Sequence, residues 1–186
     1  MIRKIKKEEI HLLYPFVFRV FSDLNFSILK KVHGRDLKNI VVNAMQNPHY
    51  RYGYEHAWVY EEKNQILGVL FGYPGSLEDF VDGPLAFSLV EHGYPAMAIK
   101  EGKEALADEW LIDTIVVAPL FRDQGIAGQL LGEAERLAKD AGFAKIGVNC
   151  PAHNKIYLHL LEKQQYEEKI RLLIRDIPFL HMVKDI

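Results

Sequence analysis

The sequence predicts an α/β fold in which one mixed β-sheet carries helices on its faces. Two observations favour this class. A nearly continuous apolar stretch at Glu109–Val117 is followed by a tight turn, an amphipathic stretch at Gly125–Ala141 and a β-rich stretch at Lys145–Cys150. A strand, a helix and a strand within about 40 residues form a βαβ unit, whose two strands are parallel. The β-rich stretches Ala57–Tyr60 and Gln65–Phe71 are separated by a polar turn, which predicts an antiparallel hairpin.

The segment before this hairpin predicts a short strand and two helices. Apolar residues alternate in Ile2–Ile5, as in a strand, and recur with a helical period in Lys7–Phe21. Pro15 lies inside the second stretch and is expected to kink or split the helix. Another helix is expected at Arg35–Met45, and Asn47-Pro48 would end it.

The remaining elements are expected as follows. Gly72–Gly75 should end the hairpin, and Ser76–Ala107 should form one helix or two short ones over the sheet. Gly142 occupies the place of a left-handed cap after the amphipathic helix. Asn154 is a good N-cap for a helix at Asn154–Gln164, and Ile170–Ile177 should be the final strand.

The composition indicates a globular chain. Hydrophobic residues make up 49% of the 186, and a net charge of −2 without a basic tract argues against a nucleic-acid partner. The one cysteine, Cys150, fits a reducing compartment, and no apolar run reaches the roughly 18 residues that would cross a membrane. Met1–Glu9 lacks the apolar core of a signal peptide. We therefore expect one cytoplasmic domain, residues 1–186, with an insertion at about 76–107 and no membrane partner.

The turn between the central strand and the amphipathic helix is suited to a pyrophosphate. Its residues are Arg122, Asp123, Gln124, Gly125, Ile126, Ala127 and Gly128. The helix start offers unpaired N–H groups and a positive dipole end, and Gly125 and Gly128 would let phosphates approach the backbone. Arg122 would add a forked positive donor. The pattern is neither a P-loop nor the dinucleotide fingerprint, and an ordinary tight turn with a surface arginine is the alternative for this loop taken alone.

The segment Val117–Ala127 resembles the acetyl-CoA signature of the GNAT N-acetyltransferase family. That signature is a strand ending in Val-x-Pro, an aromatic residue (here Phe121), and then Arg-x-x-Gly-x-Gly/Ala at the start of a helix. Ala127 stands at the second glycine position. The likeness continues through Gly142-Phe143 to Asn154, which in the family opens the next helix near the coenzyme.

The resemblance implies an acyl-CoA N-acyltransferase fold, in which a mostly antiparallel sheet has a splayed parallel central pair. Pantetheine of the co-substrate acetyl-CoA would enter the cleft beside Ile115, Val116 and Val117, and its pyrophosphate would bind the N–H groups of residues 124–128. Asn154 and Leu161 would also lie beside the coenzyme. An amine would attack the thioester directly, without a covalent enzyme intermediate. The family likeness is compatible with a homodimer.

Asp113 is the candidate base that deprotonates the amine. It lies in an apolar strand four residues before Val117, so both are expected on one face, with Thr114 on the other. A carboxylate there is costly unless it has a partner. A purely structural hydrogen-bond acceptor or salt-bridge partner is the alternative.

The proton donor to the leaving thiolate is less clear in the sequence. The family supplies it from a tyrosine seven residues after the asparagine, and this position holds Leu161. Tyr157, one helical turn earlier, is the candidate substitute, or else a core residue. Two functions stay open: an N-acetyltransferase acting on a primary amine of a small molecule or peptide, and a non-catalytic acyl-CoA-binding regulatory module.

Other polar and aromatic residues have two interpretations each. The aromatic-rich segment that leads into the hairpin could line an acceptor pocket or pack on the second helix. It comprises Tyr50, Tyr52, Tyr54 and Trp58, with Arg51 among them. The acids of the 76–107 segment could attract a cationic amine or form a solvated face; they are Glu78, Asp79, Asp82 and Glu91. Cys150 is expected to be a small buried thiol. The histidine spacing predicts no metal site.

Overall fold

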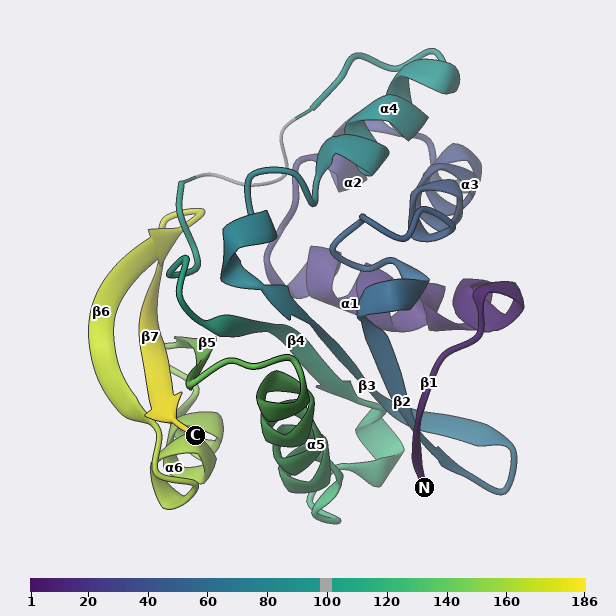
Figure 1. Ribbon diagram of the computed structural model, residues 1–186. Coiled ribbons are helices and arrows are strands. Elements are labelled where there is room, and N and C mark those ends of the chain that lie inside the picture. Colours follow the sequence, from purple (N-terminus) through teal and green to yellow (C-terminus); the bar gives the residue numbers. More distant parts are fainter. Residues whose placement is uncertain (98–101) are drawn as a thin grey trace.

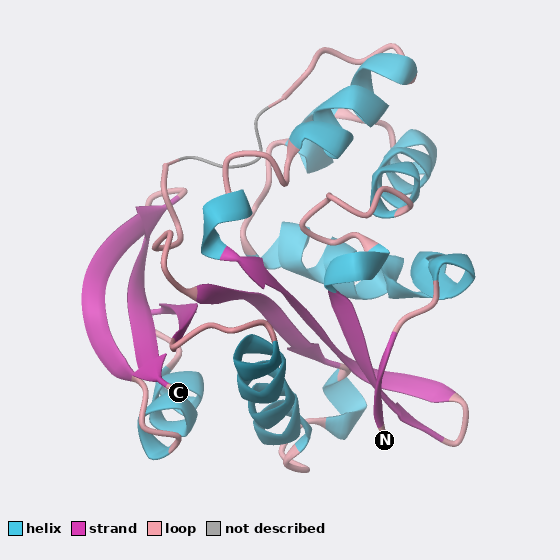
Figure 2. Ribbon diagram, in the orientation of Figure 1, coloured by secondary structure: helices cyan, strands magenta, loops and turns pink. Residues whose placement is uncertain are grey.

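The computed structural model describes residues 1–97 and 102–186, which form one seven-stranded sheet with helices on both faces (Figures 1 and 2). The strand order is β1-β2-β3-β4-β5-β7-β6. The strands are β1 (Ile2–Lys4), β2 (Ala57–Glu62), β3 (Gln65–Pro74), β4 (Trp110–Val117), β5 (Lys145–Pro151), β6 (Glu167–Ile174) and β7 (Ile177–Asp185). Only β4 and β5 pair in parallel. The predicted mixed, mostly antiparallel sheet with a parallel central pair is confirmed.

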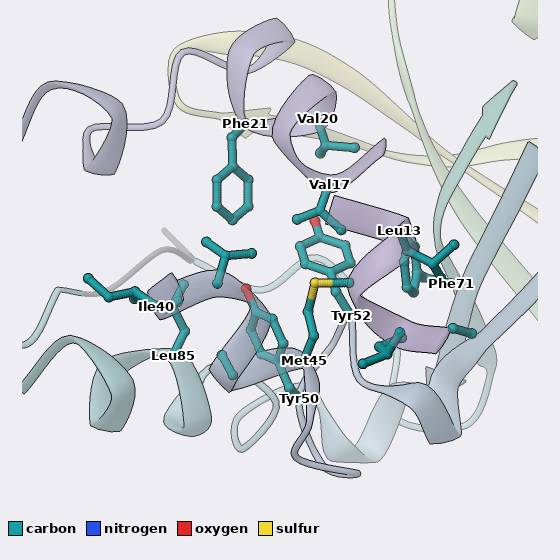
Figure 3. Close-up of a cluster of buried hydrophobic side chains, with 14 of the residues drawn as sticks. Leu13, Val17, Val20, Phe21, Ile40, Met45, Tyr50, Tyr52, Phe71 and Leu85 are labelled. Carbon is teal, nitrogen blue, oxygen red and sulfur yellow. The ribbon is translucent and has the colours of Figure 1, made fainter. Parts of the chain in front are cut away.

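The helices form two layers, one on each face of the sheet. They are α1 (Tyr14–Asp23), α2 (Ile28–Lys31), α3 (Gly34–Met45), α4 (Gly83–Glu91), α5 (Ile126–Asp140) and α6 (Lys155–Lys163). One core lies between the sheet and α1, α3 and α4 and includes Phe71 (Figure 3). The other lies between the sheet and α5 and α6 and includes Leu70. Because successive side chains of a strand point to opposite faces, these neighbours place the two cores on opposite sides of β3.

The helix expectations agree with the structure where the local pattern was strong. Pro15 divides the first helical stretch into a 3₁₀ helix at Lys7–Leu13 and α1, where proline stands in the first turn. Gly142 follows α5 with a φ of 82°, the left-handed cap that was expected. The 76–107 segment contributes α4, which packs against α3 in the helical layer, and its residues 98–101 lie outside the described residues.

The pairing of β2 with β3 ends at Phe71, as expected, but Gly72 does not end the strand, because β3 continues along β4 to Pro74. The reason lies in packing. A Cβ built at Gly72 would stand 2.0 Å from the ring of Trp110, so glycine at this position admits the indole from β4. The glycine is required by a close contact within the sheet and does not end the strand.

The expectation of a single final strand at Ile170–Ile177 is also wrong. The chain forms a hairpin there, and β7 inserts between β5 and β6. Arg175 and Asp176 both have positive φ, 52° and 63°, as in a two-residue hairpin turn. The usual Asn-Gly or Asp-Gly signal is absent at this turn, so the sequence did not predict the hairpin.

Candidate active site

The parallel pair at the centre of the sheet separates part-way along its length. β4 and β5 pair only through Trp110 with Ile146, Leu111 with Gly147, and Ile112 with Val148. Beyond these residues β4 continues along β3, and β5 continues along β7. We call the point of separation, at Asp113 and Asn149, the fork. The two strands no longer bond to each other past it, which leaves backbone groups of β4 free for a ligand.

The backbone of β4 past the fork presents two residues to this gap. The Ala118 N–H donates to the Leu67 carbonyl on β3, at 2.8 Å. Because backbone groups of successive strand residues point to opposite edges, Val116 also faces β3, whereas Ile115 and Val117 face away from it. The Val117 carbonyl accepts a bond of 3.3 Å from the Arg122 Nε. Ile115 and Val117 are therefore the residues of β4 that can pair with an extended ligand.

The first turn of α5 has the geometry of an anion site. Gly125 takes a φ of 78°, which glycine adopts without strain. The first bond back to this residue comes from the Gln129 N–H, so the N–H groups of Ile126, Ala127 and Gly128 have no partner within the helix. A Cβ built at Gly125 or Gly128 would meet nothing within 4 Å, so the space in front of both glycines is open.

The other residues of this loop are exposed. Arg122 and Asp123 lie on the surface beside the open turn, and the Gln124 amide donates to the Leu120 carbonyl at 3.4 Å. The guanidinium of Arg122 and the free N–H groups lie on one short stretch of chain. Together they fit a pyrophosphate, which carries the negative charge that this end of the helix dipole favours.

The next helix supplies the residues on the far side of the gap. Asn154 caps α6, because its side-chain oxygen accepts the Tyr157 N–H at 3.1 Å. Leu161 is fully buried in the core shared with α5. Cys150 is buried too, and burial raises the pKa of its thiol to about 12, as expected for an inert thiol.

Tyr157 differs from its neighbours because its hydroxyl is buried and has no hydrogen-bond partner in the described part of the chain. Burial, with a smaller contribution from the nearby Cys150, raises the pKa of this hydroxyl. The hydroxyl therefore stays protonated at neutral pH. An unpartnered buried hydroxyl costs about 1–3 kcal/mol of stability. A ligand atom that accepts a hydrogen bond from it would offset this cost.

A β-bulge changes the face to which Asp113 belongs. The register of β3 and β4 shifts between Phe71 and Gly72, opposite the stretch from Ile112 to Thr114. Ile112 and Ile115, three residues apart, both pack into the α5 core, so the alternation of faces is interrupted between them. The expectations that Asp113 shares the face of Val117 and that Thr114 points away from Asp113 are wrong. The Thr114 hydroxyl instead donates to Asp113, at 3.1 Å.

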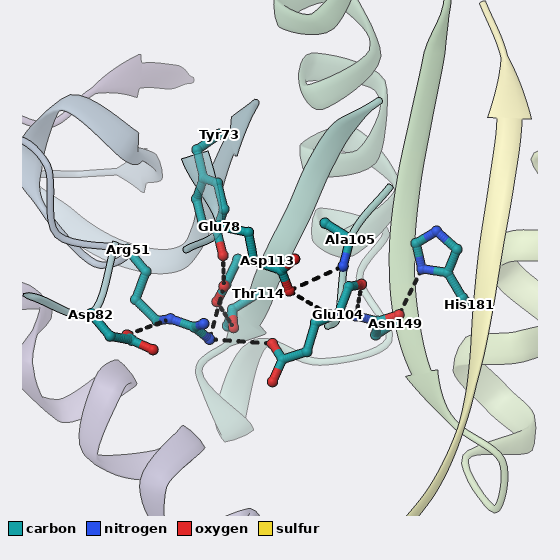
Figure 4. Close-up of polar contacts among 10 residues, drawn as sticks. All are labelled: Arg51, Tyr73, Glu78, Asp82, Glu104, Ala105, Asp113, Thr114, Asn149 and His181. Carbon is teal, nitrogen blue, oxygen red and sulfur yellow. Dashed lines mark hydrogen bonds and ion pairs between the residues drawn. The ribbon is translucent and has the colours of Figure 1, made fainter. Parts of the chain in front are cut away.

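Asp113 belongs to a buried group that we call the polar cluster: Arg51, Tyr73, Asp82, Glu104 and Asp113 (Figure 4). The Tyr73 hydroxyl donates to Asp113 at 2.8 Å, and Arg51 Nη1 lies 3.2 Å from the same oxygen. Arg51, whose side chain is only 4% exposed, also contacts Asp82 at 2.9 Å and Glu104 at 3.4 Å. Three carboxylates thus surround one guanidinium.

A second set of bonds holds the Glu104 backbone across the fork. The Asn149 amide donates to the Glu104 carbonyl at 2.8 Å, and its oxygen lies 2.7 Å from His181 Nδ1 (Figure 4). His181 Nε2 in turn lies 3.0 Å from Glu109, which is fully buried. Glu78 accepts the N–H groups of Glu104 and Ala105. The loop that carries Glu104 is therefore anchored to β5.

Comparison with known proteins identifies this arrangement. The model of the acetyltransferase (GNAT) family matches residues 31–166, which include the fork, the anion-binding turn and α6. The chain belongs to the GNAT family. Its predicted fold and family are thereby confirmed, and the family is one of acetyltransferases.

Solved structures agree with the predicted fold. A structure described as an acetyltransferase has 29% identity and a TM-score of 0.91, and the match covers 100% of this chain and 98% of that one. An N-acetyltransferase from Staphylococcus aureus Mu50 has 24% identity and a TM-score of 0.84, over 99% and 100% of the two chains. A ribosomal-protein-alanine N-acetyltransferase from Brucella melitensis has 17% identity and a TM-score of 0.61, over 100% and 99%. No curated protein matches the sequence significantly.

Two searches of the described residues gave negative results. Within residues 1–97 and 102–186, no group of three or more His, Cys, Asp or Glu side chains is placed to hold a metal ion. No helix in the same residues is long and apolar enough to cross a membrane.

Sequence reasoning missed most of the polar cluster of this GNAT protein. Arg51 was grouped with the aromatic residues beside it, and Tyr50 and Tyr52 do lie buried against α1 and α3. Asp82 was one of several acids with two interpretations, and Glu104 was not singled out. The available signal was a charged residue, Arg51, between two large apolar ones, because such a residue must be paired when it is buried.

Proposed function

We propose that this GNAT protein transfers the acetyl group of acetyl-CoA to a primary amine of a small molecule or peptide by direct attack. The observation that carries the proposal is the fork, where the backbone groups of Ile115 and Val117 face away from β3 and lead from the anion-binding turn towards Asp113. Pantetheine pairing with these two residues would place the thioester at the fork. The pyrophosphate would lie on the N–H groups of residues 124–128 beside Arg122.

The two proton transfers of this reaction, to the leaving thiolate and from the amine, take place on opposite sides of the fork. We propose that Tyr157 protonates the leaving thiolate, because its hydroxyl stays protonated and has no protein partner among the described residues. Asp113 accepts bonds from Arg51, Tyr73 and Thr114. Asp113 therefore holds Arg51 and Tyr73 of the polar cluster in place beside the thioester. Asn154 and Leu161 shape the coenzyme side as the helix cap and as a core residue.

The rival proposal is a non-catalytic acyl-CoA-binding module. It is favoured by Leu161, which stands where the family resemblance places the acid tyrosine. Both proposals predict coenzyme binding, so only turnover separates them.

The experiment is an amine panel with release of free CoA as the readout. The panel contains lysine, spermidine, glucosamine and a peptide with a free N-terminus, each mixed with acetyl-CoA and the unaltered protein. CoA release above the rate without amine, with acetylated amine detected by mass spectrometry, supports the enzyme. Coenzyme binding without release from any amine supports the module.

A further inference from the structure

We propose that Glu104, a residue of the loop before β4, accepts the proton from the acceptor amine, and that the acceptor is a cationic primary amine. This inference rests on the proposed acetyl transfer. It assigns the base to a residue outside the central strands, and it gives Asp113 a positioning role.

The first argument is the place of Glu104 in the fold. Its backbone carbonyl is bound to Asn149, the first residue of β5 past the fork. Its side chain contacts Arg51, which also contacts Asp113, the first residue of β4 past the fork. Glu104 therefore bridges the two strands at the point where they separate (Figure 4). A coenzyme that runs back along β4 from the turn at Gly125 would bring its acetyl end to this point.

The second argument is the difference between the two carboxylates. The Asp113 side chain is 3% exposed, and its two oxygens are already occupied by the Arg51 guanidinium and by two hydroxyl groups. Glu104 is 12% exposed, and in the described residues its carboxylate has a single partner, Arg51 at 3.4 Å. A carboxylate with few donors and some exposure is the better proton acceptor.

The surroundings of Glu104 also favour it as the proton acceptor. Burial raises the pKa of Glu104, Arg51 opposes this, and Asp113, Asp82 and Glu78 add to it. A base with a pKa raised from the acidic range towards neutrality exchanges a proton with an ammonium more readily. The loop stays in place meanwhile, because Glu78 and Asn149 hold its backbone.

The third argument is charge. Glu104 and Asp113 share one guanidinium, so these two carboxylates bring more negative charge to the fork than Arg51 neutralises. Such an excess attracts a protonated amine and repels an anionic acceptor.

The reaction then balances as follows. The ammonium transfers one proton to the Glu104 carboxylate, and the free amine attacks the thioester carbonyl carbon. The new C–N bond forms and the C–S bond breaks. Tyr157 donates its proton to the thiolate, which becomes the CoA thiol, and the second proton lost by the nitrogen restores the Tyr157 hydroxyl. Glu104 returns its proton to solvent. The products are the acetylated amine, CoA and one released proton, and no oxidant or metal is needed.

The test compares Glu104→Gln, which keeps the size of the side chain but cannot accept a proton as a carboxylate does, with the unaltered protein. With the best amine of the panel, kcat should fall by about a hundredfold or more, while the Kd for acetyl-CoA stays within about twofold. The rise of kcat/KM with pH that follows deprotonation of Glu104 should disappear. Glu8→Gln is the control, because it removes one exposed charge in the first 3₁₀ helix.

Other outcomes overturn the inference or the proposed function separately. If Glu104→Gln keeps its turnover and its pH profile, Glu104 is not the base, although the acetyltransferase remains. If the unaltered protein does not bind acetyl-CoA, the proposed function itself fails.

A measurement on the protein without an acceptor covers the case in which no amine of the panel reacts. Carboxyl ¹³C resonances of the glutamates are titrated by NMR, with Glu104→Gln used to assign the signal. Glu104 should titrate above the ordinary range of glutamate, and its signal should shift when acetyl-CoA is added. Titration in the ordinary range and no response to the coenzyme would overturn the inference.

Discussion

The two sides of the fork are built in different ways. Apart from the α6 residues, the coenzyme side consists of β4, the anion-binding turn and α5, one continuous stretch of chain from Trp110 to Asp140. The polar cluster gathers Arg51, Tyr73, Asp82, Glu104 and Asp113 from separate segments. A substitution on the first side should change affinity for the coenzyme, and one in the second should change folding or turnover. Matched substitutions on the two sides can test this separation.

Arg51→Ala should have the largest effect on stability. Removing the guanidinium leaves three carboxylates together in a buried site, and breaking such a buried ion pair costs about 3–5 kcal/mol of unfolding free energy. Denaturant unfolding at neutral pH measures the loss. Arg136→Ala is the matched control, because Arg136 also contacts two carboxylates, Glu133 and Asp140, but on the solvated face of α5. Equal losses in the two variants would contradict the importance of the polar cluster.

The deficit of Arg51→Ala should depend on pH. Burial already raises the pKa of Glu104 in the folded protein, and loss of Arg51 removes the contact that opposes this shift. A carboxyl with a raised folded-state pKa binds its proton before the unfolded chain does as the pH falls, so the folded state gains relative stability. The difference between the variant and the unaltered protein should therefore be greatest at neutral pH and smaller at acidic pH. A difference that grows in acid would contradict this account.

Two glycines at opposite ends of α5 give a second matched pair. Gly125 and Gly142 have φ values of 78° and 82°, and both have open space where a Cβ would stand. Valine at either position should cost about 1–3 kcal/mol of stability, because the left-handed conformation strains a β-branched residue. Only Gly125→Val should also weaken acetyl-CoA binding, since its side chain would stand in front of the free N–H groups. Equal coenzyme affinity in the two variants would exclude the turn as the phosphate site.

The smallest effect on folding is expected from Tyr157→Phe. The hydroxyl has no partner among the described residues, so its removal should leave the unfolding free energy unchanged or raise it by about 1 kcal/mol. Turnover should nevertheless fall about tenfold, because a thiolate is a fair leaving group and needs only modest help from an acid. Tyr166→Phe is the control, because it removes another buried hydroxyl, beside Glu135 on α5. Unchanged kcat in Tyr157→Phe would exclude Tyr157 as the proton donor.

The division between the coenzyme side and the polar cluster also separates what the sequence predicted from what it did not. The strand at residues 110–117, the turn at Gly125 and the amphipathic α5 follow from local patterns, and the structure agrees with each. The bulge beside Asp113 could not be predicted, because one additional residue in a ladder depends on the partner strand and leaves no periodic signal. Since every later side chain in a strand changes face after such a shift, the orientation of Asp113 was predicted wrongly.

The polar cluster was beyond sequence reasoning for a related reason. Arg51 finds its partners on the loop before α4, on the loop before β4 and on β4 itself. No local rule brings these segments together, because tertiary packing decides which acids meet. The general rule that a buried arginine needs an acidic partner does not say which acid it is.

The central claim is that the turn before α5 and the free edge of β4 bind acetyl-CoA. Its most direct test is a calorimetric titration of the unaltered protein with acetyl-CoA, repeated with Arg122→Ala. The account predicts one coenzyme bound per chain, with affinity that falls about tenfold or more in the variant, since hydrogen bonds to charged groups contribute about 1.5–3 kcal/mol. No binding by the unaltered protein, or equal affinity in both, would contradict it.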